Sequence, residues 1–230
     1  MYGSSSSRRQ LLRRSGLFAR LDDNDLDALL ARSMVTRHAE GEPIFAKGDP
    51  GNSMMAVLKG EVTITAPSND GRQVVLTAMR EGDVFGEIAL IDGKERTADA
   101  TAAKACELLV VTRGSLLSLL ERRPDLSLDL LTVLCERLRR TNEQVEDLAF
   151  LDLQTRLAKA LLRLAGGSDG AVPPSRPVAI KVSQRVLGEL AGGSRESVNK
   201  HLQDWKRAGI IAIERGAIIV REPAALVALA

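Results

Sequence analysis

The stretch between Pro124 and Gly166 most constrains the fold, because no glycine or proline interrupts it. Proline is tolerated in the first turn of a helix, so a long helical stretch is expected to open at Pro124. A break is expected near residues 150–152, followed by an amphipathic helix over residues 153–164. In the first helix, residues recur at alternating spacings of three and four, all apolar except one: Leu131, Leu134, Leu138, Thr141, Val145 and Leu148.

This spacing is typical of the seam of a short parallel coiled coil, in which the partner is the same helix of a second chain. A homodimer is therefore the predicted assembly. The alternative is that the helix packs on its own β domain. Thr141 is the polar member of the seam and Asn142 follows it, which indicates a role in register or in ligand binding.

Residues 34–112 carry short β-rich runs that turn signals such as Lys59-Gly60 separate. The runs are Met54–Leu58, Glu61–Thr65, Gln73–Thr77 and Glu107–Val111. Many short strands without intervening helices favour an antiparallel sandwich or jelly roll. Leucines among acidic residues at 21–30 predict one short capping helix before the strands. The chain is therefore expected to be α+β.

A length of 230 residues is enough for two domains of ordinary size. Hydrophobic residues make up 44% and charged residues 27%, the balance of a soluble chain, and no apolar run reaches the roughly 20 residues that span a bilayer. We therefore predict a cytoplasmic protein that does not bind a membrane. Residues 1–15 are Ser- and Arg-rich, lack the apolar core of a secretory signal, and are expected to be a disordered leader.

Cys106 and Cys135 are the only cysteines, and they form no Cys-x-x-Cys pair. The usual four-cysteine zinc and iron–sulfur frameworks are therefore excluded, and no metal site is expected. We expect two reduced, structural thiols, with a redox pair as the alternative.

The C-terminal part carries the signals of a helix-turn-helix. Ser183 is expected to cap a helix over Gln184–Ala191, Gly192-Gly193 to supply the turn, and Ser194 to cap a second helix that runs to about Arg207. Residues 152–230 hold 12 basic and 7 acidic residues, net +5, whereas residues 1–151 hold 20 and 23, net −3. A basic domain suits a phosphate-backbone partner, here double-stranded DNA.

On the second helix, Val198, Leu202 and Trp205 fall at i, i+4 and i+7 and would bury one stripe. The opposite side presents groups that read base edges: arginine or lysine donates to guanine, glutamate accepts from cytosine, and asparagine or glutamine pairs with adenine. The DNA-binding candidates are Ser183, Arg195, Glu196, Asn199, Lys200 and Gln203. Among them, Arg195, Glu196 and Lys200 are the expected base readers.

Two β-rich runs, Ile210–Ile213 and Ala217–Val220, flank Arg215-Gly216 and predict a hairpin, the wing of a winged helix-turn-helix. The alternative is an ordinary helix pair with a solvated charged face.

Residues 85–98 combine a glycine turn, a carboxylate and an arginine. Gly86 would let the backbone approach an anion, Arg96 could pair bidentately with a phosphate, and Glu87 could accept from a sugar hydroxyl. On chemistry alone, a β-turn with a surface ion pair is equally consistent with these residues.

The run Gly86-Glu87-Ile88-Ala89-Leu90, followed by Arg96-Thr97-Ala98, resembles the cyclic-nucleotide cassette of the catabolite activator (CRP/FNR) family of transcription regulators. The similarity covers roughly residues 17–220. Further matching segments, in the family's order, are Cys106-Glu107-Leu108, Asn142–Val145, Leu148–Asp152 and Ser194–Val198.

The resemblance implies that Glu87 holds the ribose 2′-hydroxyl and Arg96 the cyclic phosphate. Thr97 and the Gly86–Ala89 backbone, which includes Ile88, would complete the cradle. Thr141 would face the purine, and Asn142 would contact it from the opposing subunit. The effector implied is cyclic AMP. Cyclic GMP stays open, because Asn142 stands where the family's cyclic-AMP receptors carry serine, and its amide could serve adenine or guanine.

The resemblance also implies the domain plan. Residues 16–122 would form a cyclic-nucleotide-binding β-roll (a double-stranded β-helix), residues 123–151 the dimerisation helix and hinge, and residues 152–230 the winged helix-turn-helix domain. Cyclic AMP would reorient the two reading domains for near-palindromic DNA, and RNA polymerase is a further implied partner. Lys200 replaces an arginine expected in the recognition helix, which relaxes one base preference.

Competing functions are a cyclic-nucleotide-binding interaction module that responds to cyclic GMP or another ligand without gating DNA binding, and an enzyme such as a cyclic-nucleotide hydrolase. An enzyme is not expected, because no paired catalytic carboxylates or clustered metal ligands stand out. The iron–sulfur and haem branches of the family lack their ligands here: there is no N-terminal cysteine cluster, His38 stands alone, and His201 lies in the recognition helix.

Overall fold

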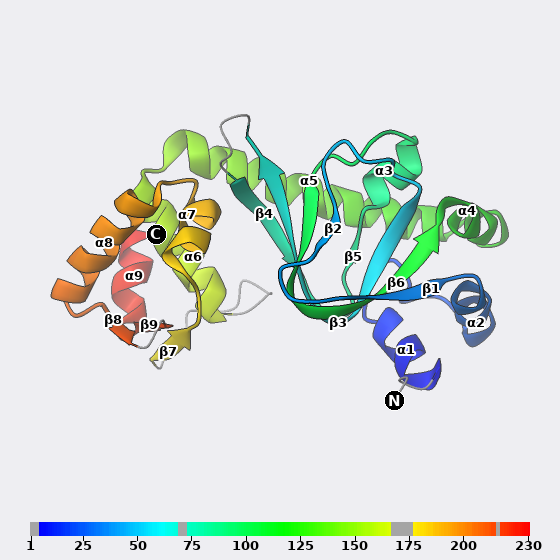
Figure 1. Cartoon of the computed structure of the whole chain (residues 1–230), viewed down its shortest axis with the longest axis horizontal. Helices are drawn as coiled ribbons and strands as arrows, with labels where there is room; N and C mark the ends of the chain where they lie inside the picture. Colours follow the sequence, from blue (N-terminus) through cyan, green and yellow to red (C-terminus); the bar gives the residue numbers. More distant parts are fainter. Residues whose placement is uncertain (1–4, 69–72, 167–176, 215–216) are drawn as a thin grey trace. The chain divides into compact units, whose positions relative to one another are not determined.

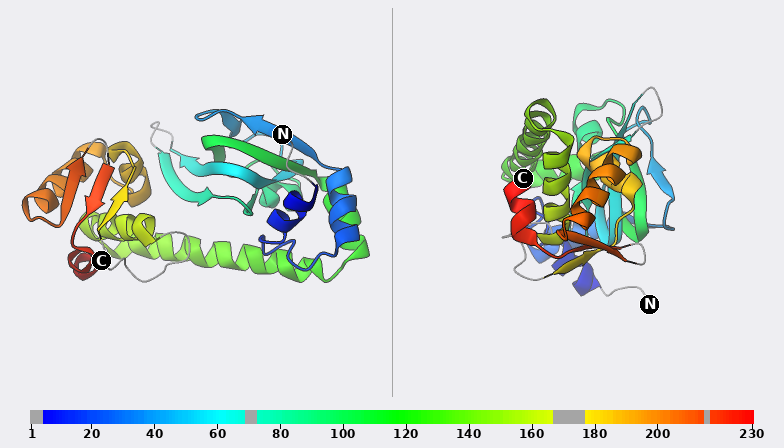
Figure 2. Two further views of the ribbon diagram at one scale, coloured as in Figure 1. Left: turned by 90° about the horizontal axis from the view of Figure 1, so that it is seen from below. Right: turned by 90° about the vertical axis from the view of Figure 1, so that its left-hand side faces the viewer.

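The computed structural model describes residues 5–68, 73–166, 177–214 and 217–230. The chain divides into two compact units, residues 1–140 and 141–230. The division falls inside α5 (Leu126–Phe150), which Figure 2 shows as one continuous helix, whereas the sequence predicted a boundary after residue 151. The predicted helix break is confirmed, because α5 ends at Phe150 and α6 (Leu153–Gly166) begins three residues later.

The first unit is built on one antiparallel six-stranded sheet (Figure 1). Its main path runs β1 (Met34–His38), β6 (Asp99–Thr112), β3 (Ser53–Pro67) and β4 (Gln73–Met79). The short strands β2 (Pro43–Phe45) and β5 (Val84–Phe85) pair with β6 and β3. With the long helix and the C-terminal helical domain, this confirms the predicted α+β fold.

The expected turn at Lys59-Gly60 is wrong, because both residues lie inside β3. The predicted runs before and after them are two halves of one 15-residue strand that pairs with β6. The pairing register shifts three times between Val57 and Val62, so the glycine marks irregular, bulged pairing rather than a chain reversal. Gly60 has φ +90°, which explains why glycine stands there.

Two hydrophobic clusters fill the first unit. One lies within the roll and includes Val57, Phe85 and Leu108. The other joins the sheet to the helices α2 (Asp23–Ala31), α4 (Arg113–Arg122) and the start of α5, through side chains such as Leu26, Leu116 and Leu126. The predicted capping helix is confirmed as α2.

Part of the expected disordered leader is ordered. Residues 1–4 lie outside the described residues, but Ser5–Leu12 form helix α1. Leu12 is buried with Phe18 and Leu26, and Arg9 and Arg13 pair with Asp23 of α2. The prediction was wrong for this helix because its few apolar side chains pack against residues of the sheet and α2. The sheet residues lie far away in the sequence and come together with the helix only in the folded chain.

The exposed face of α5 carries most of the predicted seam. Leu126 and Leu130, near the start of the helix, are buried in the first unit. On the remaining surface, Leu131 is 55% and Leu138 61% exposed, and Val145 and Leu148 are also exposed. The beginning of the helix thus packs on its own β domain, as the alternative held, while the seam residues other than the half-buried Leu134 are open to solvent in the single chain.

The second unit is a helical domain with a small sheet. It contains α6, α7 (Gln184–Ala191), α8 (Arg195–Arg207), α9 (Pro223–Leu229) and the sheet β7-β9-β8, with β7 at Val178–Ile180, β9 at Ala217–Val220 and β8 at Ile211–Glu214. Its core includes Leu161, Leu187, Leu202, Trp205 and Val220. The predicted wing hairpin is confirmed in its strands, which pair from Ile211–Val220 to Glu214–Ala217. Its predicted turn residues, 215–216, lie outside the described residues.

Both predicted caps of the helix-turn-helix are confirmed. The Ser183 hydroxyl accepts from the Val186 amide at 3.2 Å, and the Ser194 hydroxyl accepts from the Ser197 amide at 3.1 Å. Gly192 ends α7 at φ +64°. These local groups satisfy amides and carbonyls that a helix end leaves without partners.

Among the described residues, every helix is too short or too polar to span a bilayer. Both cysteines are free: Cys106 is buried in β6, and Cys135 is exposed on α5. Burial raises the pKa of the Cys106 thiol, and the Glu42 carboxylate raises it further. The Cys106 thiol therefore stays protonated at neutral pH.

Candidate nucleotide site and nucleic-acid interface

Gly86 connects β5 to α3 (Glu87–Asp92) and places the cassette. Its φ is +79°, a left-handed conformation that suits glycine, and it stands at the N-cap of α3. A Cβ atom at this position would lie 2.7 Å from Nη1 of Arg96. Because Gly86 has no side chain, the Arg96 guanidinium can approach the backbone of the turn closely.

Arg96 is buried, with only 5% of its surface exposed. Nη1 donates to the Gly86 carbonyl at 2.8 Å, Nη2 donates to the Ser53 hydroxyl at 3.2 Å, and the guanidinium carbon lies 4.3 Å from the centre of the Phe45 ring. Burial lowers the pKa of Arg96, while the charges of Asp49 and Glu87 raise it. Its Nε has no hydrogen-bond partner among the described residues.

Glu87 is 1% exposed, and only one of its two carboxylate oxygens has a hydrogen-bond partner among the described residues. Its Oε1 accepts from Nη1 of Arg137, whereas Oε2 has no hydrogen-bond partner in the described part of the chain. Buried carboxylate oxygens and guanidinium nitrogens are rarely left without partners, because each such group costs about 1–3 kcal/mol or more. The cassette therefore contains one buried acceptor, Oε2 of Glu87, and one buried donor, Nε of Arg96, that have no hydrogen-bond partner among the described residues.

Sequence reasoning missed Arg137. It lies on α5, and its Nη2 also donates to the carbonyl of Val84, the first residue of β5, so one guanidinium joins α5 to β5 and to the start of α3. The available signal was its position one helical turn before Thr141, on the helix from which a ligand contact was already expected.

The other predicted cassette residues are less enclosed. Ala89 is buried, Ile88 is exposed, and Thr97 is exposed in the bend before β6. Thr141 and Asn142 are exposed on α5 and belong to the second unit, whereas the cassette belongs to the first. Their contribution to a nucleotide site stays a prediction.

The recognition helix α8 presents the predicted side chains to solvent. Val198, Leu202 and Trp205 are buried, as expected. Arg195, Glu196, Lys200 and Gln203 are exposed, as is Ser183 at the start of α7, while Asn199 is half-buried.

One contact on this surface was not expected. The Oδ1 of Asn199 accepts from Nε2 of Gln184 at 3.1 Å and from Nε2 of Gln203 at 3.5 Å. The three amides therefore form one hydrogen-bonded group between α7 and α8.

Comparison with known proteins matches both units to families. Residues 35–123 match the family described as "Cyclic nucleotide-binding domain", and residues 155–229 match "Crp-like helix-turn-helix domain". The CRP-like cAMP-activated global transcriptional regulator of Mycobacterium tuberculosis is 34% identical over 216 residues, which cover 93% of this chain and 95% of the relative. The chain belongs to the CRP/FNR family. It is a CRP-like, cyclic-nucleotide-binding transcription regulator. The family is a family of transcription regulators and not a class of enzymes.

Other family members agree over nearly the whole length. The cyclic AMP receptor protein of Thermus thermophilus is 32% identical over 212 residues, covering 92% of this chain and 95% of the relative. The structure of CLP, a c-di-GMP-responsive global regulator of Xanthomonas campestris, superposes with a TM-score of 0.78 at 26% identity, covering 87% of this chain and 99% of that one. The predicted resemblance is thereby confirmed.

Proposed function

We propose that the chain is a homodimeric regulator whose affinity for near-palindromic DNA is set by cyclic AMP. The observation that carries the ligand half is the buried pair Glu87 and Arg96, each with one polar atom that lacks a protein partner in the described part of the chain. A ribose hydroxyl can donate to Oε2 of Glu87, and a cyclic phosphate can accept from the Nε–H group of Arg96. One ligand that carries both groups would satisfy both atoms.

Thr141 and Asn142 complete this proposal as purine contacts, with Asn142 acting across the dimer. Both are exposed side chains with hydrogen-bonding groups, on the helix whose open apolar face we assign to the second subunit. The M. tuberculosis and T. thermophilus relatives are named for cyclic AMP, which supports this effector, whereas the structural relative CLP is described as responsive to c-di-GMP. Cyclic GMP is the second candidate effector, because the Asn142 amide both donates and accepts.

The switch would act through Arg137. Its guanidinium binds one oxygen of the Glu87 carboxylate, and the proposed ribose hydroxyl binds the other. A ligand at Glu87 therefore changes the electrostatic attraction between Glu87 and Arg137, a residue of α5. A ligand shifts DNA affinity only through a difference in its binding to the two arrangements of the chain. We propose that the Glu87–Arg137 pair transmits that difference to α5, and that the DNA-bound dimer then contacts RNA polymerase.

Calorimetry and DNA titration test this function. The full chain is titrated with cyclic AMP, cyclic GMP and c-di-GMP, and DNA binding is then measured in each liganded state. We expect cyclic AMP to bind and to tighten DNA binding by about 5- to 150-fold, the usual range of allosteric coupling. Equal DNA affinity with and without cyclic AMP would contradict the switch. Tighter binding of another nucleotide would reassign the effector.

Arg137→Met should uncouple the two activities. The methionine side chain would retain apolar bulk on α5 but bring no charge to Glu87, so the ratio of DNA affinities with and without cyclic AMP should fall toward one. Ligand binding should weaken by only about tenfold, since Arg96 still meets the phosphate. Fluorescence anisotropy on labelled DNA and calorimetry give the two numbers.

The matched control is Arg140→Met, which removes an exposed arginine from the same helix. It should leave the coupling ratio unchanged. A normal ratio in Arg137→Met, or an equal loss in the control, would show that Arg137 does not carry the signal.

A further inference from the structure

The amide group of Asn199 determines which bases this residue can read. Asn199 lies one turn after Arg195 and Glu196 on α8 and one turn before Gln203, on the side that presents these exposed side chains, where Asn199 itself is half-buried. Under the proposed DNA-binding function, on which this inference rests, that side faces the major groove. Adenine recognition by asparagine is bidentate: the side-chain oxygen accepts from N6 and the side-chain nitrogen donates to N7.

The side-chain oxygen of Asn199, which would accept from adenine N6, already accepts hydrogen bonds within the protein. A carboxamide oxygen has two lone pairs, and Oδ1 of Asn199 accepts two N–H groups, from Gln184 and Gln203. The Nδ2 group keeps its two donors. An asparagine held in this way offers a base edge donors only. It can pair with the O6 and N7 acceptors of guanine or the O4 acceptor of thymine, but it cannot make the adenine pair.

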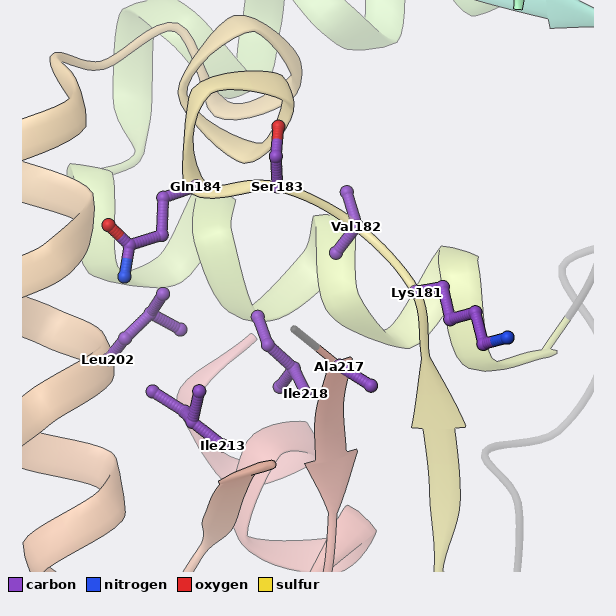
Figure 3. A pocket seen from close by; sticks show the side chains of 8 residues that line it. All are labelled: Lys181, Val182, Ser183, Gln184, Leu202, Ile213, Ala217 and Ile218. Carbon is purple, nitrogen blue, oxygen red and sulfur yellow. The ribbon is translucent and has the colours of Figure 1, made fainter. Parts of the chain in front are cut away.

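Gln184 is the residue that holds the amide. It is the first residue of α7, directly after the cap Ser183, and it is half-buried. Figure 3 shows its side chain extending toward α8 beside Leu202, while the Lys181 side chain points the other way. Its 3.1 Å hydrogen bond to Asn199 joins two helices of the same unit, so the fold supplies the orientation before DNA binds.

We propose that Gln184 is a positioning residue that fixes the amide of Asn199 with its donors outward. Asn199 then selects a base with a keto oxygen, guanine or thymine, at one position of each half-site. This replaces the adenine contact that the residue type alone predicts. A fixed donor group loses less freedom on binding than a rotating amide, so the selection is sharper.

Gln184→Glu tests the proposal by inverting the hydrogen bond. A glutamate carboxylate only accepts, so Asn199 must turn its nitrogen inward and its oxygen toward the groove. The preferred base should change from guanine or thymine to one with an amino donor, adenine or cytosine, by about tenfold. A carboxylate in the first turn of α7 is favourable, so folding should be retained.

The measurement is selection of bound duplexes from a pool with randomised half-sites, using the full chain saturated with cyclic AMP. Asn199→Ala locates the relevant position, where its profile should become flat. The control is Arg185→Gln, which changes the charge of the same turn by the same single unit. The Arg185 side chain is 77% exposed, so the control should weaken binding to all sequences alike.

The proposal is overturned if wild type prefers adenine at the located position, if Asn199→Ala changes no position, or if Gln184→Glu keeps the wild-type profile. In each case the wild-type chain still selects a site, and the proposed function survives. A wild-type chain that enriches no sequence would overturn the proposed function, and this inference with it.

Discussion

Arg96→Gln is expected to weaken cyclic AMP binding at least about a hundredfold, because charge-assisted bonds to a phosphate contribute roughly 1.5–3 kcal/mol each. Glutamine is shorter than arginine and neutral, so it loses the Nη1 donor that binds the Gly86 carbonyl and brings no positive charge into the cassette. The fold should survive, since replacing a buried charge by a neutral side chain removes its desolvation cost as well as its contacts. Calorimetry measures the affinity, and thermal unfolding checks that the chain is folded.

A second arginine near α3 provides the matched control. Arg113 donates from Nε to the Leu90 carbonyl at 2.9 Å, so it too binds backbone oxygens of this segment, but at the opposite end of the helix from Gly86. Arg113→Gln should bind cyclic AMP as the wild type does. Binding by Arg96→Gln within tenfold of wild type, or an equal loss in the Arg113 variant, would contradict the assignment of the phosphate to Arg96.

The features that could be predicted from sequence are those encoded locally. The caps Ser183 and Ser194 and the stripe Val198, Leu202 and Trp205 each depend on residues within one or two turns, and all were confirmed. The bulge at Gly60 was not predicted, since the same glycine is compatible with a turn or with a bent strand. Only the pairing with β6, some 40 residues later in the chain, decides between them.

In the candidate site, too, the residues that could be predicted are close together in the sequence, and those that could not are brought together only by the fold. Gly86, Glu87 and Arg96 lie within eleven positions of one another and carry a recognisable pattern. Arg137 lies 50 residues from Glu87, so no local pattern connects them, and its role follows only from the packing of α5 against the β-roll. The orientation of the Asn199 amide is likewise invisible in sequence, because residue type gives both a donor and an acceptor and a neighbouring helix chooses between them.

The open face of α5 gives the second large prediction. Leu138→Asp is expected to weaken dimerisation at least about a hundredfold, because each dimer loses two leucine contacts of up to roughly 1.5–3 kcal/mol and gains two facing carboxylates. Leu138 is 61% exposed in the single chain, so the variant should fold normally. Sedimentation or light scattering over a range of concentrations measures the dissociation constant.

Leu117→Asp is the control for a lost surface leucine. Leu117 is 44% exposed on α4, off the seam, so this variant should remain as dimeric as the wild type. The Leu138 variant should also lose tight DNA binding, because a monomer brings one recognition helix to a site with two half-sites. A dimeric Leu138→Asp chain would place the subunit contact elsewhere, and a monomer that still binds the full site tightly would separate DNA reading from dimerisation.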